Sequence, residues 1–304
     1  MRRLGLLAVA SLALVTGAEG SSGAVDLVAK IKVGTQPCSV ALADGSAWAT
    51  VFADDEVVRI DTGTSQVVKR IAVDSGPCGI TAGAGSIWLM NFRDATVQRI
   101  DPETNTVTAT IRVGLQPYDV AYGFGSVWVT NFGESTVFRI DPATNRVAQR
   151  IRTGQQPGGL AISRSAVWVG DLALPSIARI SPARNRVVKR VRVGAKPVWL
   201  AAKGYTVFAS VQGSRSIARV DERTNRRVRL IRGMGVQPVD AGIVAGDLWV
   251  PNLRSNTVTR VDIKRNRVKE TIRVGSGPFV VPDDPAELWV PSFSGDDVWR
   301  LRPR

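Results

Sequence analysis

Residues 116–154 read QPYDVAYGFGSVWVTNFGESTVFRIDPATNRVAQRIRTG, and variants of this unit follow one another along nearly the whole chain. Each copy begins with a proline, has a large aromatic residue eleven positions later and an arginine twenty-two positions later. The prolines are Pro37, Pro77, Pro117, Pro157, Pro197, Pro238 and Pro278. The aromatic residues are Trp48, Trp88, Trp128, Trp168, Phe208, Trp249 and Trp289. The arginines are Arg59, Arg99, Arg139, Arg179, Arg219, Arg260 and Arg300. A repeat of this length indicates stacked supersecondary units.

Each unit contains short apolar runs separated by turn residues. Four runs are predicted to be strands: Val120–Ala121, Val127–Thr130, Thr136–Ile140 and Val147–Thr153. Glycines in the segment 123–126 suit a tight hairpin, and the proline in 141–145 suits the second position of a β-turn. No helical period is present in the unit. Four antiparallel strands per copy are typical of a propeller blade, so the chain is predicted to be all-β.

The two ends of the repeat array predict a closed ring. The last copy stops at Arg304, which leaves it without a fourth strand. Residues 27–34 have the fourth-strand pattern but precede the first copy. We therefore expect a seven-bladed β-propeller whose N-terminal strand completes the C-terminal blade and removes an open sheet edge.

The N-terminal residues differ from the rest of the chain. Arg2 and Arg3 precede an apolar run from Leu4 to Val15, and small residues follow. This pattern predicts a signal peptide at residues 1–20, with cleavage between 18 and 24, and a single propeller domain at 21–304. The apolar run is too short to span a bilayer, and no other segment is a candidate. We expect an exported, periplasmic or secreted, monomeric protein.

Two cysteines occupy equivalent positions in neighbouring copies. Cys38 and Cys78 each follow the proline of their copy, so both are expected beside the central channel. A disulfide between them is one interpretation, which an oxidising compartment would favour. It requires Cα atoms within roughly 7 Å of each other. Two small buried thiols are the other interpretation, and the sequence does not separate them.

Basic residues are concentrated in one sector of the ring. Residues 146–232 hold 19 of the 40 Lys and Arg residues of the chain but only 3 of its 26 Asp and Glu residues. Nine of these basic residues are candidates for binding a polyanion such as a cell-surface polymer or nucleic acid: Arg150, Arg152, Arg186, Lys189, Arg190, Arg192, Arg226, Arg227 and Arg229. Protection of exposed strand edges against aggregation is the favoured explanation of the alternating charges themselves, although it does not explain their confinement to one sector.

The chain contains no histidine. This excludes Ser-His-Asp and Cys-His nucleophile systems and histidine-ligated zinc, and two cysteines are too few for a cysteine-rich zinc site. Acidic clusters such as Asp54–Glu56 lack the spacing of an EF-hand and are interpreted as solvated loop residues. No catalytic residue, metal site or cofactor is predicted.

Ligand-binding residues in a repeat fold are expected where the copies differ at equivalent positions. The loops that precede the first strand and those between the second and third strands share one face of the disc. Candidates on this face are Tyr118, Asp119, Lys196, Trp199, Asp240, Asn91, Asn131, Asp171 and Asn252. Aromatic rings among amides and acids suit a polar ligand. For the recurring asparagines we favour hydrogen bonds to neighbouring loops, whereas packing and binding remain open for Trp199 and Tyr118.

The amino-acid sequence of the repeats resembles that of a known family. VWVTNF at 127–132, TVFRIDPATNRV at 136–147 and the VG-x-x-P junctions resemble the YVTN repeat of YncE-like seven-bladed propellers. They are also similar to the repeats of streptogramin (virginiamycin B) lyases. The first resemblance implies an exported binding protein for an unknown ligand or envelope partner. The second implies a lyase with a histidine base and a Mg²⁺-assisted site, and no residue here matches that histidine. A non-catalytic binding propeller is therefore the favoured hypothesis, and a lyase- or hydrolase-like enzyme with a carboxylate or metal site is the alternative.

Overall fold

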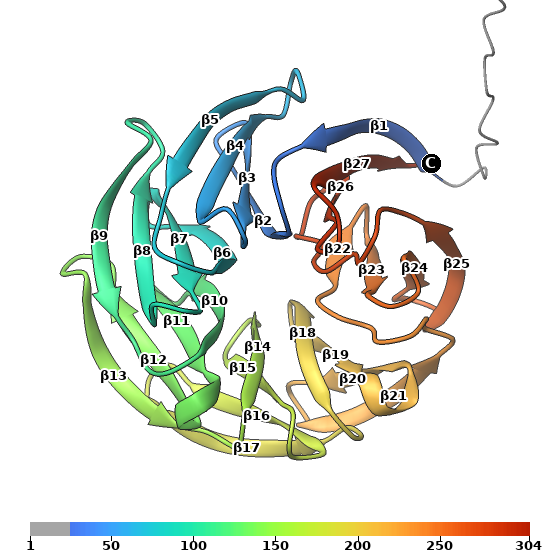
Figure 1. The fold of residues 1–304 in the computed structure, drawn as a ribbon. Helices are drawn as coiled ribbons and strands as arrows, with labels where there is room; N and C mark the ends of the chain where they lie inside the picture. Colours follow the sequence, from blue (N-terminus) through green and yellow to red (C-terminus); the bar gives the residue numbers. More distant parts are fainter. Residues whose placement is uncertain (1–24) are drawn as a thin grey trace, which may run out of the picture.

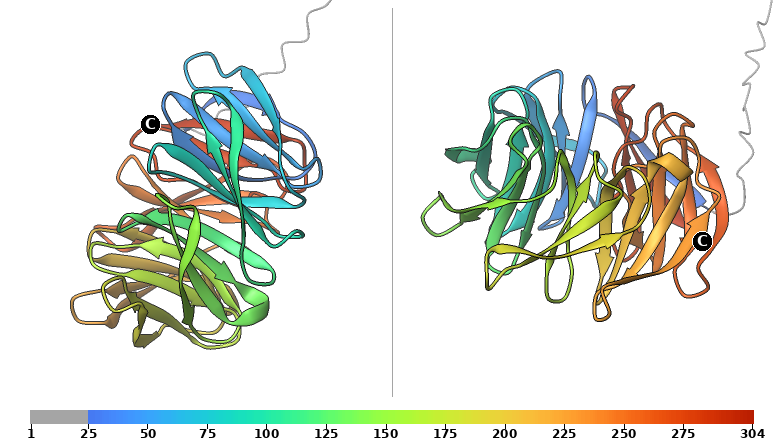
Figure 2. Two further views of the ribbon diagram at one scale, coloured as in Figure 1. Left: turned by 90° about the vertical axis from the view of Figure 1, so that its left-hand side faces the viewer. Right: turned by 90° about the horizontal axis from the view of Figure 1, so that it is seen from below.

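The computed structural model describes residues 25–304, which form a ring of seven antiparallel sheets around a central channel (Figure 1). This confirms the predicted seven-bladed β-propeller. The predicted signal peptide and its cleavage region lie outside the described residues. Seen from the side, the blades are twisted sheets with loops projecting from both faces of the disc (Figure 2).

Six blades are complete four-stranded sheets in which the strands follow one another from the channel outwards. Blade 1 has β2 (Pro37–Ala43), β3 (Ser46–Val51), β4 (Glu56–Asp61) and β5 (Val67–Ala72); blade 2 has β6 (Pro77–Gly83), β7 (Ser86–Asn91), β8 (Thr96–Asp101) and β9 (Thr106–Arg112). Blade 3 has β10 (Pro117–Gly123), β11 (Ser126–Asn131), β12 (Thr136–Asp141) and β13 (Arg146–Arg152); blade 4 has β14 (Pro157–Ile162), β15 (Val167–Asp171), β16 (Ser176–Ser181) and β17 (Arg186–Arg192). Blade 5 has β18 (Pro197–Lys203), β19 (Thr206–Val211), β20 (Ser216–Asp221) and β21 (Arg226–Arg232); blade 6 has β22 (Gly242–Val244), β23 (Asp247–Asn252), β24 (Thr257–Asp262) and β25 (Arg267–Arg273).

Two short 3₁₀-helices, η1 (Phe132–Glu134) and η2 (Gln212–Ser214), lie in the loops between the second and third strands of blades 3 and 5. These loops, together with the loops before the repeat prolines, form what we call the proline face of the disc. The hairpins between first and second strands form the opposite, hairpin face. Within residues 25–304, no helix is long and apolar enough to span a membrane.

The seventh blade is assembled from both ends of the chain, as predicted. Its strands β26 (Leu288–Pro291) and β27 (Asp297–Pro303) come from the C-terminal end, and β1 (Val25–Lys32) pairs antiparallel with β27 as the outermost strand. The N-terminal segment thus covers the edge that β27 would otherwise expose.

The innermost position of blade 7 is taken by an extended segment, residues 278–284, in place of a regular strand. It forms parallel bridges to blade 6, from Asp240 to Val280 and from Val244 to Asp284. Pro282 has no amide hydrogen to donate, which interrupts the regular ladder. The inner segments of blades 6 and 7 therefore lie against each other beside the channel.

The aromatic residues of the repeat form the contacts between blades. Their side chains, including Trp128, are at most 2% exposed. Each packs against the apolar side chains of the following blade, as Trp48 does against Ile80 and Leu89 of blade 2. Trp289 of blade 7 packs against Val40 of blade 1, which closes the ring. Truncating a buried tryptophan of this kind to alanine costs about 3–5 kcal/mol.

Six of the seven repeat arginines connect their blade to a turn in the next, whereas Arg260 is bonded mainly to Asp247 and Glu270 of its own blade. The Arg139 guanidinium lies 5.1 Å from the centre of the Trp128 ring and donates to the Pro182 carbonyl (2.9 Å) and to Asn185 Oδ1 (2.8 Å) of blade 4. The aspartate two residues later, Asp141, instead accepts the amide hydrogen of Ala143 within its own turn.

Candidate functional site

A layer of side chains lies across the channel at the proline face. Its members stand one or two positions after the repeat prolines, at the start of the inner segments. They are Cys38 and Cys78 from blades 1 and 2, Tyr118 from blade 3, Trp199 from blade 5 and Phe279 from blade 7. Residues that are far apart in the sequence thus meet at one end of the channel.

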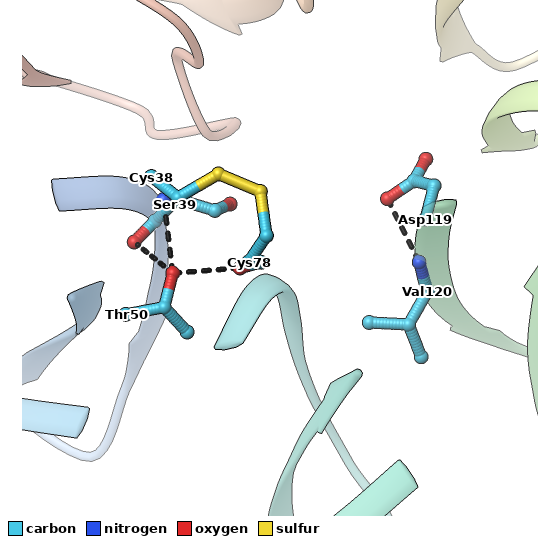
Figure 3. Close-up of a disulfide and its surroundings, with 6 residues drawn as sticks. All are labelled: Cys38, Ser39, Thr50, Cys78, Asp119 and Val120. Atoms are coloured by element: carbon cyan, nitrogen blue, oxygen red, sulfur yellow. Dashed lines mark hydrogen bonds between the residues drawn. A yellow bond between two sulfur atoms is a disulfide. The ribbon is translucent and has the colours of Figure 1, made fainter. Parts of the chain in front are cut away.

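The two cysteines of this layer form a disulfide in the structure (Figure 3). Their Cα atoms are 5.1 Å apart, within the range that a disulfide requires. Thr50 holds the local backbone: its hydroxyl accepts the Ser39 amide hydrogen (3.0 Å) and donates to the Cys78 carbonyl (2.6 Å). Blades 1 and 2 are therefore joined at the channel by a covalent bond and by a shared hydroxyl.

The aromatic members of the layer stack into a row. The Tyr118 ring is 5.1 Å from the Trp199 ring, and Trp199 meets Phe279 edge-on at 5.3 Å. Phe132 and Phe293 continue the row at its two ends. Trp199 is only 4% exposed, so its ring is a packing element of this layer.

Two glycines of blade 4 allow this row to cross from blade 3 to blade 5. A Cβ atom on Gly159 would lie 2.8 Å from a ring carbon of Trp199, and one on Gly158 would lie 2.7 Å from the Val198 carbonyl oxygen. Both distances are below ordinary van der Waals contact. The absence of side chains on blade 4 therefore creates the space that Trp199 fills.

Behind this layer the channel contains a cavity of about 350 Å³. Its lining residues come from the inner segments of all seven blades, with Leu200, Ile162 and Val281 among them, and most of the surface that they expose is polar. Three carboxylic acids also line it: Asp119, Asp240 and Asp283. Asp119 and Asp240 stand at equivalent repeat positions close to the aromatic layer, whereas Asp283 lies towards the hairpin face.

The Asp119 carboxyl is held by two backbone amides. Its oxygens accept the amide hydrogens of Val120 (2.8 Å) and of Leu160 in the next blade (2.7 Å). Figure 3 shows the Asp119 side chain projecting into the space opposite the disulfide. Burial raises the pKa of Asp119 to about 7, against the lowering effect of these two bonds. Burial of the neighbouring Tyr118 side chain, together with the charge of Asp119, raises the pKa of Tyr118 to about 12.

The Asp240 carboxyl accepts no hydrogen bond from any described residue. Burial raises its pKa well above the usual value, and the neighbouring charges of Asp119 and Asp283 raise it further. Burial also raises the pKa of Asp283, although the Ile243 amide (2.6 Å) donates to it and the charge of Lys203 opposes the rise. The three acids share one cavity and are coupled through their charges.

The remaining candidates on the proline face lie away from the cavity. Asn91, Asn131 and Asn252 are fully buried and donate to threonine hydroxyls in the next strand of their own blades, rather than to neighbouring loops as expected. The Asp171 carboxylate is 2% exposed and caps a turn through the amides of Ala173 and Leu174. Lys196 is exposed in the loop before β18.

Ser39 and Asp283 were missed as cavity residues by sequence reasoning. Ser39 occupies the same position, two after the proline, as Asp119 and Asp240. Comparing that single position across all seven copies gives Ser39, Gly79, Asp119, Gly159, Trp199, Asp240 and Val280. This comparison would have identified Ser39, but the inward position of Asp283 depends on the irregular segment of blade 7.

The nine polyanion candidates lie on three neighbouring outer strands, β13, β17 and β21, at the lower rim in Figure 1. Eight are exposed and Arg190 is half-buried. Two clefts of about 490 and 330 Å³ open between blades 4 and 5. The larger is lined by Arg190, Arg192, Arg226 and Arg227.

A model of the YncE-like β-propeller family matches residues 62–279, which is more than half of the chain. The chain belongs to the YncE-like β-propeller family. No curated protein matches it at a significant level.

Two solved structures resemble this YncE-like propeller in fold. Hydrazine synthase from Kuenenia stuttgartiensis has a TM-score of 0.78 at 14% identity, with 90% of this chain and 97% of that chain covered. Virginiamycin B lyase from Staphylococcus aureus has a TM-score of 0.78 at 16% identity, with 91% and 99% covered. At such identities the likeness shows the fold alone.

Proposed function

We propose that this YncE-like propeller is an exported, non-catalytic binding protein that attaches to a polyanion through the basic rim formed by β13, β17 and β21. The observation that carries the proposal is the concentration of exposed basic side chains on three adjacent outer strands. The absence of histidine from the chain supports binding over lyase chemistry.

Edge protection alone does not account for this rim. Every blade exposes an outer strand, so every blade faces the same risk of edge-to-edge pairing. The outer strand β9 carries one basic residue, β1 and β5 carry two each and β25 carries three, whereas β17 and β21 carry four each. The additional charges on blades 4 and 5 therefore call for another explanation.

Most of these charges are unpaired within residues 25–304. Among the nine candidates only Arg190 approaches a carboxylate, with its Nη1 3.9 Å from Asp171 Oδ2. Arg150 lies over the Phe138 ring, and Arg227 donates to the Val193 carbonyl. The others are free to meet an anionic partner, and guanidinium groups suit phosphate, sulfate and carboxylate oxygens.

The rim favours a partner recognised by charge. The sequences RVAQRIR, RVVKRVR and RRVRLIR of the three strands contain no aromatic residue. Single-stranded nucleic acids are usually held by aromatic side chains that stack on the bases. We therefore expect contacts to the partner's anionic groups alone, with a strong dependence on salt.

Retention on a heparin column and on immobilised inorganic polyphosphate tests the proposal. Lys189→Glu with Arg192→Glu reverses two charges on the basic rim, and Lys69→Glu with Arg112→Glu makes the same change on blades 1 and 2. The rim variant should elute at clearly lower salt than wild type, and the matched variant should elute close to wild type. Equal shifts for the two variants would mean that net charge alone controls retention, and the rim would then be no docking surface.

A further inference from the structure

The axial cavity is acidic within a strongly basic protein. Its lining includes Asp119, Asp240 and Asp283 but no lysine or arginine, whereas the whole chain has a formal net charge of +14. Lys203, whose charge acts on Asp283, lies beside it at the hairpin-face rim. The cavity therefore concentrates negative potential where the rest of the molecule is positive.

Unused hydrogen-bonding groups face this cavity near its closed end. The Ser39 side chain is more than nine-tenths buried, and its hydroxyl has no hydrogen-bond partner among residues 25–304. Figure 3 shows Ser39 on the side of the channel opposite Asp119. The Asp240 carboxyl also accepts no bond, and Gly79 leaves room beside Asp119, since a Cβ there would lie 3.2 Å from Asp119 Oδ1. The Ser39 hydroxyl and the Asp240 carboxyl are therefore available to bond a ligand that enters the cavity.

A metal ion does not suit this arrangement. Ca²⁺ takes six to eight oxygen ligands held close together. Within the described part of the chain, no three acidic or cysteine side chains come near enough to one another to share an ion. A larger cation, which reaches separate carboxylates with different atoms, fits the spacing better.

The acids of the cavity lie at two levels along the channel. Asp283 stands three residues further along its inner segment than the position equivalent to Asp240, which corresponds to about 10 Å at the rise of a strand. Val40, Leu160 and Ala241, which lie between the two levels, are packed between blades and add no charge to the cavity. Two acids at one level and a third at the other match a linear chain with a positive charge at each end.

We propose that the axial cavity binds a linear aliphatic diamine or polyamine. One ammonium group donates to Asp119, Asp240 and Ser39, the hydrocarbon spans the distance between the two levels, and the second ammonium reaches Asp283. This site is separate from the basic rim, so it stands or falls independently of polyanion binding.

An ion pair in this cavity would offset the free-energy cost of ionising its buried acids. Burial disfavours the charged forms of Asp119 and Asp240, and their mutual repulsion adds to it. An ammonium between them compensates both effects and supplies the missing donor to Asp240. Binding is therefore expected to release protons near neutral pH and to be stronger at pH 8 than at pH 6.

Titration calorimetry at pH 8 with 1,6-diaminohexane, 1-hexylamine and 1,6-hexanediol separates the contributions. The diamine should bind at least tenfold more tightly than the monoamine, and the diol should not bind. Asp240→Asn should abolish binding of both amines, whereas Asp283→Asn should weaken only the diamine, to the level of the monoamine. Ser39→Ala should weaken both amines about threefold.

Melting curves and circular dichroism establish that each variant is folded. Asp283→Asn provides the second route if Asp240→Asn does not fold, because it changes a rim residue. Absence of amine binding to wild type would overturn the proposal. So would binding of the diol as tight as that of the diamine, unchanged affinity in both aspartate variants, or displacement of the diamine by Ca²⁺ at equal concentration.

Discussion

Replacing Ile31 with alanine should destabilise the protein by about 3 kcal/mol, because Ile31 anchors the strand that closes the ring. Ile31 lies in β1, is 6% exposed and packs in one cluster with Trp289 of blade 7 and Val40 of blade 1. Three carbon atoms are lost from this cluster, each worth about 0.8 kcal/mol of burial, and the remaining cavity adds a smaller penalty.

Urea unfolding gives the free energy, and a thermal melt should show a decrease of roughly 6–12 °C. Val28→Ala is the matched control. Val28 lies in the same strand but is 37% exposed, at the bulge where the pairing with β27 shifts. Its replacement should change the free energy of unfolding by less than about 0.5 kcal/mol.

Equal effects of Ile31→Ala and Val28→Ala would refute the reasoning, because β1 would then be a loosely attached arm. A chain lacking residues 25–32 extends the test. It should melt far below wild type and form concentration-dependent oligomers, since β27 would become an exposed edge strand. An unchanged melting temperature and a monomeric state would show that closure does not depend on β1.

Two further predictions concern residues beside the channel. Replacing both Cys38 and Cys78 with serine should lower the free energy of unfolding by about 4 kcal/mol, because the bond closes a loop between residues 40 positions apart; two reactive thiols in denatured, oxidised wild type would contradict the disulfide. Ionisation of the Asp119 carboxyl should lower the free energy of unfolding as pH rises. Its pKa is about 7 in the folded chain against 3.8 for a free side chain, so the folded form holds the proton longer. Stability should therefore fall between about pH 4 and pH 7, by at most about 4 kcal/mol from this group. Urea midpoints across this range should fall less steeply for Asp119→Asn, and parallel profiles for the two proteins would exclude the effect.

Repeat spacing and strand pattern were enough to predict the architecture. The tryptophans and arginines recur because each blade makes the same contact with the next, so a periodic structure leaves a periodic sequence. Closure by the N-terminal strand was also predictable, since residues 27–34 supply the one strand that the last copy lacks. These features depend on local strand pairing and on one repeated packing contact.

The chemistry of the channel depended on the tertiary structure. Tyr118 and Trp199 are candidates for ligand binding by residue type, but they stack into a covering layer because Gly158 and Gly159 leave an empty space between them. The position of Asp283 inside the cavity likewise follows from the irregular inner segment of blade 7. The sequence alone determined the blades and the ring. Which side chains meet across the channel was decided only by the curvature of that ring, because these contacts join residues that the repeat period does not relate.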